Sequence, residues 1–229
     1  MSRMHSWLRG RRLLSLIALL SLAVLYSSVL AQWAAGQAAA PPYVVRVEED
    51  WTLTVNQPEG ESAAPQVSTQ MARSPLAWRF VNFHLNSCDL PQFSSGGLQL
   101  QTWFGNTNEA VYTSPNGTIM GTDNELVTWT QYLDNTSGQL VFGISAASST
   151  TWGNFSGMSV TVPSGHTSLD NYSADYSAAN SGITYGANRV ASLVLVANRM
   201  IYSDGTIVTD NTPRVIYSAV LDSTISGGN

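Results

Sequence analysis

Apolar and polar side chains alternate along most of the chain, and the clearest example lies between residues 125 and 144. Two runs rich in β-branched, aliphatic and aromatic residues, 126–133 and 139–144, flank the polar loop 134–138, which ends in Gly138. Residues of this kind favour a pleated, half-buried surface, and a terminal glycine offers a position for positive φ. The pattern predicts a β-hairpin.

The same period of two predicts further strands on both sides of this hairpin. Residues 51–56 place Trp51, Leu53 and Val55 on one face and polar side chains on the other. Residues 78–86 carry large side chains on both faces, which is typical of a strand in the middle of a sheet. Other strands are predicted at 43–47, 66–71, 98–103, 110–113, 158–162, 190–202, 207–208 and 214–217.

No stretch has a convincing helical period, and residues 165–186, which lack apolar rhythm, are predicted to form a long loop. About a dozen strands separated by Gly, Pro and Asn turns indicate a sandwich or a barrel. We therefore predict an all-β fold, an antiparallel β-sandwich over residues 43–217, with a disordered tail at 218–229.

From Gly96 to Tyr217 the order of features resembles the concanavalin A-like, laminin-G-like family of jelly-roll sandwiches. The features are the long hairpin at 127–144 and the apolar strand 190–202, which runs into the Asp204-Gly205 turn. This resemblance is architectural and covers roughly the last two thirds of the predicted folded part. It implies a jelly-roll β-sandwich and no particular activity.

The whole segment after the export signal also looks similar to exported bacterial proteins of unknown role, with Val47-Glu48-Glu49-Asp50-Trp51 near its start and Thr150-Thr151-Trp152-Gly153-Asn154-Phe155 later. This second resemblance implies export and carries no activity. It agrees with the pattern at the start of the chain.

Residues 1–31 have the order of an export signal. A basic segment ends at Arg12, an apolar run follows, and the small-x-small pattern that ends at Ala31 suits a signal peptidase. We expect cleavage after Ala31 or after Ala40, a linker at 32–42, and a periplasmic, cell-surface or extracellular protein. An uncleaved membrane anchor is the alternative, because the apolar run approaches the roughly 20 residues that span a bilayer.

The composition argues against nucleic-acid and anionic lipid partners and excludes an internal disulfide bond. The 229 residues carry a formal net charge of −5 and include no lysine, and four of the ten arginines precede residue 13. Phosphate groups are bound largely through Lys and Arg, so we expect neither nucleic acid nor an anionic lipid surface as partner. A membrane contact is expected only through an uncleaved N-terminal segment. The single cysteine, Cys88, excludes an internal disulfide.

The candidate acids and bases do not form a known catalytic pattern. Glycosidases of the resembled fold carry alternate acids on one strand, whereas Glu48-Glu49-Asp50 are consecutive and point to opposite faces. Past the export signal only His84 and His166 remain, without a nucleophile motif or zinc-ligand spacing. We therefore predict a protein that is not an enzyme, and keep an unfamiliar glycoside hydrolase as a less favoured reading.

Calcium is the one cofactor that the sequence leaves open. Asp170 and Asp175 lie in an Asn-rich loop whose oxygens could bind a structural Ca²⁺. The spacing matches no EF-hand, and an Asx-rich loop without metal is the favoured alternative. No other metal or cofactor is expected.

Aromatic and amide side chains in polar surroundings give the main functional hypothesis. Sugars stack on aromatic rings while amides bind their hydroxyl groups, and such sites need few charges. The candidates are Trp103, Trp152, Asn154, Tyr172 and Tyr176. Each ring could instead fill the core. We predict an exported, non-catalytic β-sandwich that binds a neutral glycan (a polysaccharide) or another cell-surface ligand; the alternative is a structural or assembly protein of the cell envelope.

Overall fold

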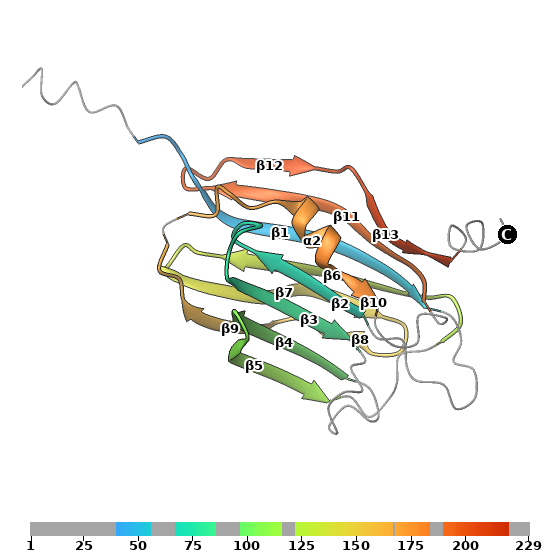
Figure 1. Ribbon diagram of the computed structural model, residues 1–229. Coiled ribbons are helices and arrows are strands. Elements are labelled where there is room, and N and C mark those ends of the chain that lie inside the picture. Colours follow the sequence, from blue (N-terminus) through green and yellow to red (C-terminus); the bar gives the residue numbers. More distant parts are fainter. Residues whose placement is uncertain are drawn as a thin grey trace, which may run out of the picture. The chain divides into compact units, whose positions relative to one another are not determined.

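The computed structural model describes residues 40–55, 67–85, 97–115, 122–166, 168–183 and 190–219. The chain divides into Met1–Pro41 and Pro42–Asn229, and every element below lies in the second unit. The predicted export signal and most of the linker lie outside the described residues, as does the predicted tail beyond residue 219. Within these ranges the fold is all-β, with two antiparallel sheets and one short helix (Figure 1).

The larger sheet has the strand order β12-β11-β1-β6-β7-β8, with β13 also beside β11 and β9 also beside β7. The strands are β1 (Val44–Val55), β6 (Glu125–Asp134), β7 (Gln139–Ser149), β8 (Gly153–Asn154), β9 (Met158–Pro163), β11 (Val190–Tyr202), β12 (Ile207–Asp210) and β13 (Arg214–Ser218).

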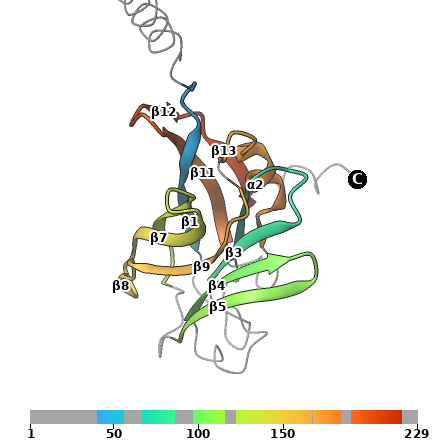
Figure 2. The same ribbon diagram turned by 90° about the vertical axis from the view of Figure 1, so that its left-hand side faces the viewer.

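The smaller sheet has the order β10-β2-β3-β4-β5. Its strands are β2 (Val67–Ala72), β3 (Arg79–Leu85), β4 (Gly97–Phe104), β5 (Thr107–Pro115) and β10 (Gly182–Ile183). β3 lies in the middle of this sheet, as its two faces of large side chains predicted. Seen from the side, β4 and β5 belong to a different layer from β1 and β11 (Figure 2).

The predicted central hairpin is confirmed as β6 and β7. Leu133 pairs with Phe142 near the loop, and Gly138 has a φ of 74°, the positive value expected of the loop glycine. The two strands predicted at 43–47 and 51–56 are one continuous strand, β1. They join because the segment between them, including the buried Glu49, also pairs with neighbours on both sides, β6 and β11.

The prediction of a loop over 165–186 was wrong in two respects, because α2 (Ala174–Asn180) and the short strand β10 lie within it. The buried positions of this helix are the small residues Ala174 and Ser177, which give no apolar rhythm in the sequence. Asp175 in the first turn was the remaining helix signal. Among the described residues, no helix has the length and apolar composition needed to cross a bilayer.

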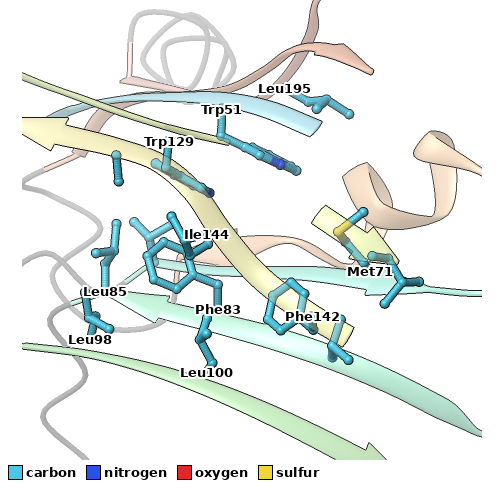
Figure 3. Packing of buried hydrophobic residues seen from close by; sticks show 14 of the residues in the cluster. Trp51, Met71, Phe83, Leu85, Leu98, Leu100, Trp129, Phe142, Ile144 and Leu195 are labelled. Atoms are coloured by element: carbon cyan, nitrogen blue, oxygen red, sulfur yellow. The ribbon is translucent and has the colours of Figure 1, made fainter. Parts of the chain in front are cut away.

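The core lies between the inner faces of the two sheets. Trp51 and Trp129 occupy paired positions on β1 and β6, and their rings stack with centroids 6.1 Å apart. Phe83 of the smaller sheet meets Trp129 edge-on at 5.6 Å. Figure 3 shows the two indoles side by side, with Phe83 and its aliphatic neighbours across the interior. Aromatic burial of this kind contributes strongly to joining the two layers.

A carboxyl group lies inside this apolar interior. Glu49 on β1 has 0% of its surface exposed. Its Oε2 accepts hydrogen bonds from Trp51 Nε1 at 3.1 Å and Gln131 Nε2 at 2.9 Å. The hydroxyl group of Tyr172 bonds Oε1. The carboxyl is therefore fully partnered without water.

These bonds continue into the other sheet and into the helix. The Thr69 hydroxyl of β2 donates to Gln131 Oε1 at 2.7 Å, which connects the smaller sheet to the larger one. The Tyr172 hydroxyl lies 3.0 Å from Ser177 Oγ of α2. We call Glu49, Thr69, Gln131, Tyr172 and Ser177 the Glu49 cluster.

Burial raises the pKa of Glu49 from its ordinary 4.5 to about 7, although the bonds from Tyr172, Gln131 and Trp51 oppose the rise. Between these two values the unfolded chain releases the proton while the folded chain retains it. The contribution of Glu49 to the free energy of unfolding therefore falls as pH rises through this window and is constant above it. The loss amounts to about 3 kcal/mol.

We predict that Glu49→Gln removes this pH dependence. The amide oxygen can accept from Trp51 and Gln131, and its NH₂ group can donate to the Tyr172 hydroxyl if that hydroxyl turns to donate to Ser177 Oγ. The difference in unfolding free energy, variant minus wild type, should increase by about 3 kcal/mol between pH 4 and pH 8. Urea unfolding at a series of pH values measures it.

Glu125→Gln provides the control for that experiment. Burial alone would raise the pKa of Glu125, but hydrogen bonds from Thr151 and Thr122 outweigh it and the pKa is lowered. The stability that Glu125 contributes is thus present above about pH 4.5 and is lost at lower pH. If the difference in unfolding free energy between Glu49→Gln and wild type did not change between pH 4 and pH 8, the raised pKa of Glu49 would be contradicted.

Candidate functional site

Hollows that carry polar and aromatic side chains occur on the described surface. The first, of about 340 Å³, lies on the outer face of the larger sheet and includes Asp50, Thr128, Thr130 and Ser148. The Asp50 carboxylate accepts bonds from Arg199 Nη2 at 2.8 Å and from the Thr130 hydroxyl at 2.7 Å. The hydrogen bond from Arg199 is the main reason why the pKa of Asp50 is lowered. Its charge is therefore already paired.

The same face carries a row of ion pairs across three strands. Arg46 bonds Glu48 at 2.8 Å and Asp134 at 3.1 Å, and Arg199 bonds Glu48 at 3.0 Å. The Arg46 guanidinium also lies 4.0 Å from the centre of the Tyr132 ring. These ion pairs hold β1, β6 and β11 side by side. Glu48 and Asp50 therefore have a structural role.

The second hollow, which we call the rim groove, has a volume of about 260 Å³. It lies between the β4–β5 hairpin and the segment from Trp152 to Met158, and none of its lining residues is charged. The lining residues are Leu98, Tyr112, Ser114, Trp152, Asn154, Phe155, Ser156 and Met158.

Local bonds hold the aromatic and amide groups of the rim groove in place. Trp152 and Phe155 meet edge to face, with ring centroids 5.4 Å apart. Asn154 Oδ1 accepts bonds from the Ser156 backbone N–H at 3.0 Å and the Ser156 hydroxyl at 2.7 Å. Gly153 has a φ of 64°, which glycine adopts without strain. The turn therefore presents an oriented amide beside two rings.

Glu125 holds this turn in place through hydrogen bonds from Thr151. Its Oε1 accepts a bond from the Thr151 backbone N–H at 2.6 Å, and its Oε2 accepts one from the Thr151 hydroxyl at 2.7 Å. Glu109 is likewise held, by Arg79 at 2.6 Å. Both carboxylates therefore have structural partners within the fold.

Two of the predicted ligand-binding residues, Trp152 and Asn154, come together in the rim groove. Trp103 does not join them. It lies on the outer face of the smaller sheet, stacked on Phe80 at 6.4 Å, and its Nε1 donates to Gln101 at 2.7 Å. Sequence reasoning missed Tyr112 because it comes from β5, a strand distant in the chain.

The two predicted tyrosines lie elsewhere. Tyr172 is 6% exposed and its hydroxyl belongs to the Glu49 cluster, so its ring is part of the core and offers no face to a ligand. Its polar sequence neighbours gave the opposite impression. Tyr176 is half-buried on α2 and is not among the residues that line the rim groove.

The calcium candidates have separate protein partners. Asp170 Oδ1 accepts a bond from the Val44 backbone N–H at 2.7 Å, and Asp175 Oδ1 forms an ion pair with Arg214 at 2.8 Å. Within the described ranges, no group of three or more His, Cys, Asp or Glu side chains is placed to hold a metal ion. Asp170 and Asp175 anchor the loop and helix that complete the Glu49 cluster.

No family model matches the chain, and no curated protein matches its sequence.

The third hollow, the end pocket, has a volume of about 190 Å³. It includes Trp78, which is 74% exposed, with Leu76 at 89% and Phe104 at 53%. Sequence reasoning placed Trp78 on a strand face and missed this exposure. The turn residue Pro75, just before Leu76, was the available signal.

We predict that hydroxyl-radical footprinting separates the tryptophans by these positions. Trp78 should be oxidised at least tenfold faster than Trp51 and Trp129, which are 1% and 2% exposed. Peptide mass spectrometry of the full chain measures each rate. Equal oxidation of Trp129 and Trp78 would contradict the placement of Trp129 in the core.

Proposed function

We propose that this protein is an exported, non-catalytic β-sandwich that binds a neutral glycan in the rim groove. The observation that carries the proposal is the lining itself, in which aromatic rings, an oriented amide and hydroxyl groups share one hollow without any charged residue. A neutral ligand suits such a lining because no buried ion is left without a partner.

The groups match the chemistry of a sugar ring. The C–H faces of a sugar stack on aromatic rings, and Tyr112, which is 39% exposed, presents such a surface. Asn154 and Ser114 provide groups that bind sugar hydroxyls. The volume of about 260 Å³ is below the range of about 300–1,000 Å³ for drug-sized ligands, so we expect one or two sugar units inside the groove.

We extend the proposal to the fold family and the location. Two packed antiparallel sheets and the long β6–β7 hairpin support a concanavalin A-like jelly roll. The basic and then apolar order of residues 1–31 supports export through a cleaved signal. A polysaccharide of the cell surface is the corresponding partner.

A second candidate is an assembly role in the cell envelope, and the free edge of the larger sheet favours it. β12 and β13 expose Ile207, Val208 and Val215 at 59%, 50% and 56%. An exposed apolar edge strand can pair with a strand of another chain.

The glycan proposal is tested by array screening of neutral polysaccharides and calorimetry on the best one. We expect Trp152→Ala, Tyr112→Ala and Asn154→Ala each to weaken binding by about tenfold, since an aromatic contact of this kind contributes about 1 kcal/mol or more. Trp103→Ala is the matched control, because it removes a half-buried tryptophan outside the groove. It should leave the affinity unchanged.

Failure of the wild-type protein to bind any neutral glycan, or an equal loss in Trp103→Ala, would refute the proposal.

Sedimentation of the protein at a series of concentrations tests the second candidate, an assembly role in the cell envelope. Concentration-dependent assembly that Val208→Arg abolishes would favour the envelope role, and a monomer at every concentration would oppose self-assembly through this edge.

A further inference from the structure

The end pocket lies where the turn between β2 and β3 meets the segment that follows β9. Its apolar lining is Leu76, Trp78, Phe104 and Leu140, and its polar lining is Arg73, Arg79, Ser164 and His166, with Ala77 between them. None of these residues lines the rim groove. The end pocket is therefore a separate place for a ligand.

Trp78 forms an aromatic wall of the end pocket, and the turn between β4 and β5 supports the indole on its other side. The Gly105 backbone N–H donates to the Trp78 carbonyl at 2.8 Å, and a Cβ on Gly105 would lie 3.6 Å from Cε3 of the ring. Gly105 has a φ of 56°, which favours glycine at this position. One side of the indole thus packs on the β4–β5 turn, while 74% of the residue remains exposed.

Arg79 organises the opposite side of the pocket and is itself neutralised. It bonds both Glu109 oxygens, at 2.6 and 2.8 Å, and donates to the Pro163 carbonyl at 2.8 Å. Its guanidinium also lies 5.4 Å from the centre of the Phe104 ring. These contacts tie the segment after β9 to β3, which brings Ser164 and His166 beside the aromatic residues.

Hydrogen bonds to the backbone of His166 fix this border of the end pocket. The His166 carbonyl accepts bonds from Asn135 Nδ2 and from the Ser164 hydroxyl, each at 3.0 Å. The pocket is consequently bordered by anchored segments and needs no large rearrangement to receive a ligand.

Arg73 differs from the other arginines of the described chain. Arg46, Arg79, Arg199 and Arg214 each bond at least one carboxylate at 3.1 Å or less. Arg73 is half-buried in the end pocket and has no ion pair with any residue in the described ranges. A cation beside apolar side chains favours an anionic partner, and a guanidinium binds a carboxylate through two parallel hydrogen bonds.

We propose that the end pocket binds a monocyclic aromatic carboxylate, with its ring on Trp78 and its carboxylate on Arg73. The size agrees, since a cavity of about 150 Å³ is known to hold benzene and this pocket measures about 190 Å³. One unpaired guanidinium matches a single negative charge. A phosphate dianion would need a second cation, and Arg79 is already paired with Glu109. This site is independent of the proposed glycan function.

Benzoate is the probe for the test, titrated into the ¹⁵N-labelled full chain and followed by NMR and calorimetry. We expect saturable binding with shift changes centred on Trp78 and Arg73. Benzyl alcohol, which keeps the ring and lacks the charge, and acetate, which keeps the charge and lacks the ring, should each bind at least tenfold more weakly. Inorganic phosphate should not displace benzoate.

Variants identify the two contacts. Arg73→Gln and Trp78→Ala should each weaken benzoate binding at least tenfold, and both side chains are exposed enough for the fold to persist, which far-UV circular dichroism checks. Arg214→Gln is the matched control, because it removes one positive charge outside the end pocket and should leave the affinity unchanged.

The proposal is overturned if benzoate does not bind saturably, if benzyl alcohol binds as tightly as benzoate, or if Arg73→Gln binds like wild type. Shift changes centred on Tyr112 and Trp152 would also overturn it, because they would place benzoate in the rim groove. Loss of glycan binding in Trp152→Ala bears only on the rim groove, so the two functions succeed or fail separately.

Discussion

A carboxyl group inside an apolar core imposes the strictest requirement on this fold. Glu49 has no access to water, so every oxygen must find a protein donor or carry a proton. The partners come from four places: Trp51 on the same strand, Gln131 on β6, Tyr172 before the helix and, through it, Ser177 on α2. Segments that are distant in the sequence must therefore meet around the Glu49 carboxyl, beside α2.

Several side chains that could carry chemistry have structural partners in this fold. Tyr172 bonds Glu49 instead of facing a ligand, Glu125 holds the turn below Trp152, and Arg79 joins Glu109 to the segment after β9. Aromatic, amide and hydroxyl groups line the rim groove at the surface, and Trp78 with Arg73 lines the end pocket. Binding, without a reaction centre, is the function that we propose for this distribution.

The sequence predicted those features that depend on neighbours along the chain. Alternation identified the inner faces of β1 and β2, the large side chains of 78–86 predicted the central place of β3, and the β6–β7 hairpin was predicted as well; Trp152 and Asn154 came together because they are two residues apart. Features that depend on distant partners were missed. Glu49 appeared only as one of three consecutive acids, Tyr172 as a loop aromatic, and α2 as loop, because the contacts that bury them come from other elements.

Direct titration of the Glu49 side chain tests this account most closely. The carboxyl carbon can be followed by ¹³C NMR in protein labelled at glutamate, with its resonance assigned by its absence in Glu49→Gln. For the buried carboxyl we predict a midpoint near pH 7, well above the ordinary value of 4.5. A midpoint near 4.5, the ordinary value, would show a hydrated carboxylate and would contradict the buried cluster on which the arrangement of the sheets, loop and helix depends.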